Sequence, residues 1–259
     1  MEPHHWDILD FLDLRLNHGS DEIRARDIFT ALWTSDLFMK RVKNNEPWTL
    51  FCPSETNDLS DIFGEEFEQK YIEYENNETI RKKTIQAQDL WNRILQSITE
   101  TGSPYICFKD TANKCNSQSN LGTIKSSNLC TEIFEYSDAE NTAVCNLASI
   151  ALPKFLDEEK KIFDAEKLMH YTKILVRNLN KCIDKTYYPT VEAERSNHRT
   201  RPLAIGVQGF GDLLNKMELA YDSEDAIRLS KHIAESMYLA ALQESCELAK
   251  KFGPYSAFK

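Results

Sequence analysis

A cysteine with an amide and a carboxylate two positions away on either side is the pattern in this sequence that best suits chemistry. Asn128, Cys130 and Glu132 occupy alternate positions of one short stretch. In an extended chain alternate side chains project to one face. The spacing therefore predicts a sulfur between a hydrogen-bonding amide and a general base, all within reach of one small ligand. A thiolate nucleophile wants a basic neighbour, so the carboxylate favours a sulfur that stays protonated until it loses a hydrogen atom.

A plainer interpretation stays open from spacing alone. Asn128 and Glu132 would be surface polar residues on an edge strand, and Cys130 a half-buried filler. Most cysteines in such a chain are small buried hydrophobes. The seven cysteines form no CxxC pair and no regular framework, which argues against a zinc knuckle and a secreted disulfide scaffold. They stand at positions 52, 107, 115, 130, 145, 182 and 246, and no metal site is predicted.

Composition narrows the class of protein. The 259 residues are 41% hydrophobic and 28% charged, as in an ordinary folded protein. A formal net charge of -10 disfavours nucleic acid as a partner. The sequence has neither an apolar run long enough to span a membrane nor a secretory signal at its start. We therefore expect a cytoplasmic protein with no membrane partner.

The elements that must position the trio can be outlined from periodicity and breakers. Alternation of strands with long helices predicts an α/β fold with mostly parallel strands, and no repeat, linker or domain boundary is evident. Helices are expected at Arg24–Lys43 (one or two), Glu65–Glu75, Lys82–Glu100, Asp164–Lys185 and Ser223–Phe252; strands or extended segments at Glu46–Pro53, Tyr105–Lys109, Ile124–Tyr136 and Pro202–Val207; and a polar loop at Lys114–Lys125.

The stretch Gly122–Ile133, followed by Ala143–Ser149, closely resembles the finger-loop region of class I ribonucleotide reductase large, catalytic subunits. The resemblance continues in family order over nearly the whole chain. In Glu2–His5, His4 stands where the family usually has Trp. Further matching blocks are Asp36–Val42, Trp48–Pro53, Gly64–Glu68, Thr99–Tyr105, Val176–Asn180, Ile205–Asp212, Ser245–Ala249 and Gly253–Tyr255.

The resemblance implies a fold and an extent. The family fold is a ten-stranded α/β barrel of two five-stranded halves, with the radical cysteine on a finger loop through its centre. Residues 1–259 would be a part of that catalytic barrel domain. The allosteric N-terminal region, the C-terminal part of the barrel and the cysteine-bearing tail of the family would be absent.

The resemblance also implies roles for the site residues. Cys130 would become the thiyl radical that removes the 3′ hydrogen of the ribose, and Glu132 would accept the 3′-hydroxyl proton. Asn128 would hydrogen-bond the substrate and take part in acid/base chemistry. Cys145 would be one of two redox-active cysteines that supply reducing equivalents and end as a disulfide.

The implied activity is reduction of ribonucleoside diphosphates for DNA synthesis. The implied partners are a small, metal-containing subunit that supplies the radical, complementary large-subunit segments, and thioredoxin or glutaredoxin. No cofactor is expected on this chain, because the ATP and deoxynucleotide effectors would bind family regions absent here. We expect the chain to be inactive alone. A degenerate, non-catalytic remnant is the alternative, and an unrelated α/β binding protein is a third.

Overall fold

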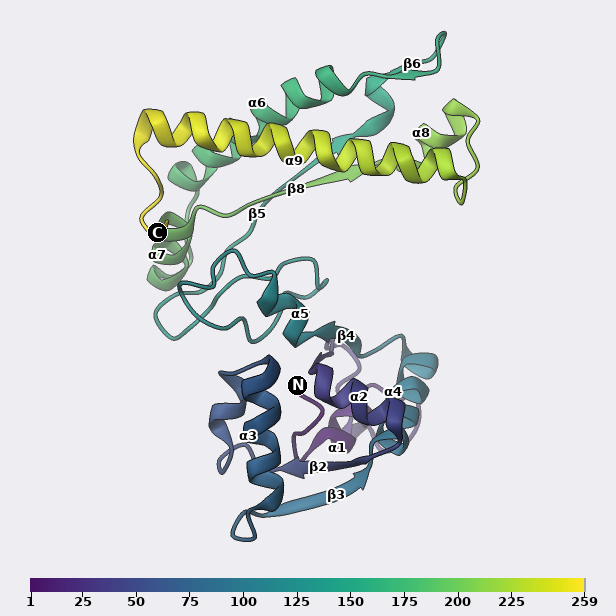
Figure 1. Ribbon diagram of the computed structural model, residues 1–259, viewed down its shortest axis with the longest axis vertical. Coiled ribbons are helices and arrows are strands. Elements are labelled where there is room, and N and C mark those ends of the chain that lie inside the picture. The colour runs from purple at the N-terminus through teal and green to yellow at the C-terminus, as the bar shows by residue number, and fades with distance from the viewer. Residues whose placement is uncertain (259) are drawn as a thin grey trace. The chain divides into compact units, whose positions relative to one another are not determined.

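The computed structural model describes residues 1–258, and their contacts form two compact units, one of Met1–Ser137 and one beginning at Asp138 (Figure 1). No composition change in the sequence marks this division. Each unit has its own hydrophobic core, and each is described by itself.

The first unit surrounds a core rich in aromatic side chains. Trp48 and Tyr71 stack with ring centroids 4.5 Å apart, and both are fully buried. The Tyr71 hydroxyl donates to the Thr49 carbonyl at 2.8 Å and accepts the Thr49 N–H at 2.7 Å. The elements of this unit are α1 (Ile8–Asp13), β1 (Ala31–Thr34), α2 (Asp36–Asn44), β2 (Pro47–Phe51), α3 (Gly64–Asn76), β3 (Lys82–Gln86), α4 (Ala87–Thr101), β4 (Tyr105–Phe108) and α5 (Lys109–Lys114), with 3-10 turns at Asp21–Ile23 and Asn57–Ser60.

Two helix predictions in this unit need correction. Within Arg24–Lys43, residues 31–34 form strand β1, which pairs in parallel with β4, and only the part from Asp36 is helical. Ile28 and Phe29, whose spacing with Leu32 fits a helical stripe, are about half exposed. Within Lys82–Glu100, the first five residues form β3, antiparallel to β2. In both places pairing with a distant strand overrode the local pattern.

The second unit packs helices against one parallel strand pair. Its elements are β5 (Asn146–Ala151), β6 (Leu156–Asp157), β7 (Ile162–Phe163), α6 (Ala165–Lys185), α7 (Val191–Thr200), β8 (Leu203–Gln208), α8 (Phe210–Met217) and α9 (Glu224–Phe252), with a 3-10 turn at Leu152–Phe155. Helices α6 and α9 lie side by side (Figure 1). An ion pair between Arg177 and Glu244, 3.2 Å apart, joins them.

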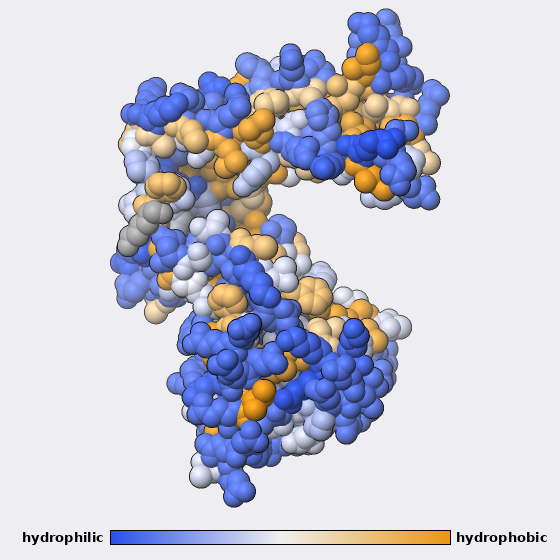
Figure 2. All heavy atoms as spheres, in the orientation of Figure 1, coloured by the Kyte–Doolittle hydropathy of each residue, from blue (hydrophilic) through white to orange (hydrophobic). Residues whose placement is uncertain are grey.

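The surface of α9 is only partly covered. Figure 2 shows hydrophobic side chains among the hydrophilic ones over the helices of this unit. The large apolar side chains of α9 that remain exposed are Ile227, Tyr238, Leu239, Leu242 and Phe252.

The predicted fold class is confirmed at its coarse level, since the chain mixes strands and helices. The expectation of mostly parallel strands holds for β1–β4 and β5–β8 and is wrong for β2–β3 and β6–β7. The strands of residues 1–258 form four two-stranded sheets and no closed barrel. The strands predicted at Glu46–Pro53, Tyr105–Lys109 and Pro202–Val207 are confirmed.

Candidate active site

Cys130 lies near the tip of a loop of the first unit, residues 122–136, that contains neither helix nor strand. At the tip the Thr131 N–H donates to the Asn128 carbonyl at 3.2 Å, and Thr131 has a φ of 65°. This left-handed conformation is uncommon for a β-branched residue. The extended conformation predicted for Ile124–Tyr136 is therefore wrong here, and alternation along a strand does not set the directions of the trio's side chains.

Side chains close the turn. The Ile133 N–H donates to Asn128 Oδ1 at 3.1 Å, and Ser127 Oγ donates to the Ile133 carbonyl at 2.6 Å. Such local bonds from Ser and Asn to the backbone offer it an alternative to a strand ladder. They explain why this polar stretch folds back on itself rather than running straight.

The three side chains at the tip are exposed. Because Asn128 Oδ1 accepts the Ile133 N–H, the Asn128 Nδ2 group is the part of the amide left to donate to a ligand. Within residues 1–258, the side chains of Cys130 and Glu132 take part in no hydrogen bond or ion pair. The turn thus presents a donor, a thiol and a carboxylate to solvent.

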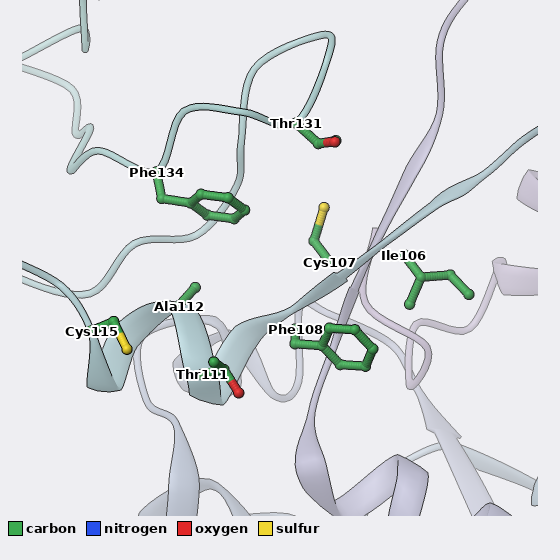
Figure 3. A pocket seen from close by; sticks show the side chains of 8 residues that line it. All are labelled: Ile106, Cys107, Phe108, Thr111, Ala112, Cys115, Thr131 and Phe134. Carbon is green, nitrogen blue, oxygen red and sulfur yellow. The ribbon is translucent and has the colours of Figure 1, made fainter. Parts of the chain in front are cut away.

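An apolar hollow lies beneath this turn. Thr131 and Phe134 line one side of a cavity of about 260 Å³, and residues of β4 and α5 line the other (Figure 3). The Cys107 sulfur points into the cavity in Figure 3, and burial raises the pKa of this thiol. The Phe134 ring also stacks on Trp33, with centroids 5.9 Å apart. These contacts hold the loop against the β1–β4 pair.

A further titratable group in the loop is Glu135. Its carboxyl is half-buried, and burial raises its pKa to about 7. The carboxyl of Glu135 therefore gains or loses its proton near neutral pH. The sequence had no signal for this property, because the property comes from the packing around Glu135.

Cys145 belongs to the second unit, where it directly precedes β5 and is partly buried. The next residue is tightly held: Asn146 Nδ2 donates to Asn197 Oδ1 at 2.7 Å and to the Pro202 carbonyl at 2.8 Å. Asn197 is fully buried, and its Nδ2 donates to the Tyr188 hydroxyl at 2.5 Å. These bonds fix the start of β5 and so the backbone next to Cys145.

Comparison with known proteins shows the family of this chain. All of residues 1–259 match the family described as "Ribonucleotide reductase, barrel domain". The chain belongs to the ribonucleotide reductase large-subunit family. It is 56% identical to a ribonucleoside-diphosphate reductase large subunit of Plasmodium falciparum, and 52% identical to large chains of Cryptosporidium parvum and Saccharomyces cerevisiae. Each match covers 100% of this chain but only 30 to 32% of the relative, so the chain spans about a third of the length of the relatives it matches.

Two further findings describe this ribonucleotide reductase segment. Among residues 1–258, no group of three or more His, Cys, Asp or Glu side chains is arranged to hold a metal ion. The helices of the same residues include none that is long and apolar enough to cross a membrane.

Sequence reasoning missed the residues that hold the reductase loop in place. Asn113, Asn116 and Gln118 lie in or beside Lys114–Lys125, for which the sequence predicts a polar loop. Their one visible signal was the richness of Lys114–Lys125 in amide side chains.

Proposed function

We propose that this chain is part of the catalytic core of a ribonucleoside-diphosphate reductase and acts in the reduction of ribonucleotides to deoxyribonucleotides in the cytoplasm. The observation that carries the proposal is the match of all 259 residues to the barrel family, with identities of 52 to 56% to large subunits. The exposed turn at Cys130 is consistent with a thiol that must meet both a substrate and a radical source.

In the proposed reaction Cys130 acts first. As a thiyl radical it takes the 3′ hydrogen atom of the ribose and becomes a thiol, while Glu132 accepts the 3′-hydroxyl proton and Asn128 Nδ2 donates a hydrogen bond to the substrate. The 2′-hydroxyl then leaves with a proton as water. A radical next to a deprotonating hydroxyl expels its neighbour far more readily than a closed-shell ribose does.

The reducing equivalents in the proposal come from two thiols. Cys145 and a second cysteine, from outside these 259 residues, give two electrons and two protons and become a disulfide. One proton leaves in the water, and the other proton with one electron forms the new C2′–H bond. The second electron reduces the 3′ carbonyl, to which Glu132 returns its proton. Cys130 returns its hydrogen atom to C3′ and is again a thiyl radical. Thioredoxin or glutaredoxin then reduces the disulfide.

The proposal also covers architecture and partners. Residues 1–259 would form one part of a ten-stranded barrel, with loop 122–136 as its finger loop and complementary large-subunit segments supplying the remaining strands. A small, metal-containing subunit would deliver the radical. ATP and deoxynucleotide effectors would bind to those other segments.

The test uses the chain combined with complementary segments of a relative's large subunit, its small subunit and thioredoxin, with CDP reduction as the assay. The chain alone should give no turnover. In the complete mixture Cys130→Ser should abolish turnover, because a hydroxyl O–H bond is too strong to give its hydrogen atom to the radical source. Glu132→Gln should lower the rate by about 10² or more through loss of the base.

Two further variants separate the cysteines. Cys145→Ser should stop reduction yet still allow radical breakdown of the substrate with release of its base. Cys182→Ser changes an exposed cysteine of α6 and should behave as wild type. An inactive mixture, when the relative's own barrel segment is active under the same conditions, would instead mark the chain as a non-catalytic remnant. Turnover by Cys130→Ser would show that the assignment of this cysteine is wrong.

A further inference from the structure

We propose that Asn113, Asn116 and Gln118 are positioning residues whose side-chain amides set the geometry of the loop that carries Cys130. The importance of that geometry for catalysis rests on the function proposed above. The amides come from the end of α5 and the turn after it, and they bind backbone groups at both ends of loop 122–136.

Asn113 binds the N-terminal end of the loop, at Ile124, through both backbone groups, as a neighbouring strand would. The Ile124 N–H donates to Asn113 Oδ1 at 2.7 Å, and Asn113 Nδ2 donates to the Ile124 carbonyl at 3.0 Å. The same Nδ2 group donates to the Lys109 carbonyl at 3.0 Å, which ties the amide to its own helix. Asn113 is 4% exposed and Ile124 fully buried. Both backbone groups of Ile124 would be buried without a partner if this amide were lost, which makes the loss costly.

Asn116 and Gln118 bring the two ends of the loop together. Asn116 Nδ2 donates to the Gly122 carbonyl at 3.1 Å, and the Tyr136 N–H donates to Gln118 Oε1 at 2.7 Å. The Tyr136 ring covers Gly122 so closely that a Cβ atom added there would overlap a ring carbon. Residues 122 and 136 are thereby held at one place.

The position of Cys130 depends on these amide bonds at the ends of the loop, because no strand ladder holds the loop between its ends and its tip. The tip is closed by the bonds of Ser127 and Asn128 to Ile133 and by the Thr131 N–H, which donates to the Asn128 carbonyl. A loop whose ends are released samples many more conformations. Small misplacements of a reacting group cost large factors in rate. The amides therefore act on Cys130 at a distance, through the backbone.

The test compares two substitutions at Gln118 in the 259-residue chain. Gln118→Leu removes the oxygen that accepts the Tyr136 N–H, whereas Gln118→Glu keeps an oxygen in the same place. With Leu, exchange of the Tyr136 amide hydrogen should become about fivefold faster, the effect of losing one hydrogen bond. The alkylation rate of Cys130, measured relative to Cys182, should change in the same variant. With Glu, both measurements should return to wild-type values.

Two more variants extend the comparison. Asn113→Asp keeps the acceptor for the Ile124 N–H but can no longer donate to the Lys109 and Ile124 carbonyls. It should loosen the N-terminal end of the loop. Ser119→Ala changes an exposed residue of the same turn and should leave both measurements unchanged. Unchanged hydrogen exchange in α4 would show that the first unit is folded in every variant.

The proposal is overturned if Gln118→Leu leaves the Tyr136 and Cys130 measurements unchanged, or if Gln118→Glu behaves like Gln118→Leu. None of these measurements requires turnover. In the reconstituted enzyme, Gln118→Leu should lower kcat more than it raises KM, and Gln118→Glu should restore kcat. The two proposals can fail separately. If Gln118→Leu loosens the loop as expected but Cys130→Ser keeps turnover, the proposed function is refuted and the role of the amides stands.

Discussion

Replacing Lys109 by methionine should destabilise the first unit more than most single substitutions do. The Lys109 side chain is fully buried, and its Nζ lies 3.0 and 3.1 Å from the two Glu2 carboxylate oxygens and 2.7 Å from the Leu59 carbonyl. It also lies 4.6 Å from the centre of the Phe67 ring. Burial raises the pKa of Glu2 and lowers that of Lys109, so for each group desolvation outweighs the attraction of the other.

The expected magnitude follows from that balance. Removing one partner leaves the other charge buried and unpaired, which costs about 3–5 kcal/mol. Replacing both partners by neutral side chains of similar size removes the desolvation cost as well. Lys109→Met should therefore lower the free energy of unfolding by about 3–5 kcal/mol, and Glu2→Gln combined with Lys109→Met should recover a large share of the loss.

The assay can be confined to the first unit. All four tryptophans, at positions 6, 33, 48 and 91, belong to it, so urea unfolding followed by tryptophan fluorescence reports on this unit alone. Lys83→Met, at an exposed lysine of β3, is a matched control expected to stay within about 0.5 kcal/mol of wild type. A loss below about 1 kcal/mol for Lys109→Met, or a double variant as unstable as the sum of its parts, would refute the reasoning.

Two pH-dependent predictions follow from other buried groups. Burial lowers the pKa of His4 from 6.5 to about 3, so the unfolded chain takes up a proton first and stability is lost as pH falls below 6.5. Between pH 7 and pH 5 the free energy of unfolding measured in urea should fall by about 2 kcal/mol less in His4→Trp than in wild type. An equal fall in both proteins would contradict this. Burial raises the pKa of Glu135 from 4.5 to about 7, so its contribution to stability is present below pH 4.5 and is lost as pH rises through 7. After a discount for partial exposure, Glu135→Gln should stabilise the first unit at pH 8 by about 1–2 kcal/mol and have little effect at pH 4.5, whereas equal stability at pH 8 would count against it.

The long helices of the second unit could be predicted from sequence because their signals are local. In α9 the Ser223 hydroxyl accepts the Ala226 N–H at 3.2 Å, and in α6 the Asp164 carboxylate accepts the Lys167 N–H at 2.9 Å. In each helix the N-cap and the apolar residues of the buried stripe are neighbours in the sequence, so a short window of sequence contains the whole signal. Helical periodicity places Tyr171 with the inward residues of Asp164–Lys185, yet its side chain is 49% exposed.

Strand β1 and the turn at Cys130 could not be predicted in the same way. The four residues of β1 are a strand because β4, far along the chain, supplies their hydrogen-bond partners. The turn depends on a Ser, an Asn and a left-handed Thr131 whose combined effect outweighs the strand-like spacing of the trio. The residue types at the candidate site could be chosen from sequence, but their local geometry could not.

The parallel pairing of β1 with β4 has a consequence for how the first unit folds. Ala31 pairs with Tyr105, which is 105 − 31 = 74 positions later. Pairings this distant raise the contact order and slow folding, because closing a long loop costs entropy before the contacts form. During synthesis β1 must wait until β4 has left the ribosome, with its apolar Leu32 and Trp33 still uncovered. The Asn113 and Gln118 bonds that anchor the loop span short distances in sequence. Their amides lie in or just after α5, however, and α5 directly follows β4, so their position depends on the β1–β4 pairing. We therefore expect the loop that carries Cys130 to be among the last parts of this unit to become ordered.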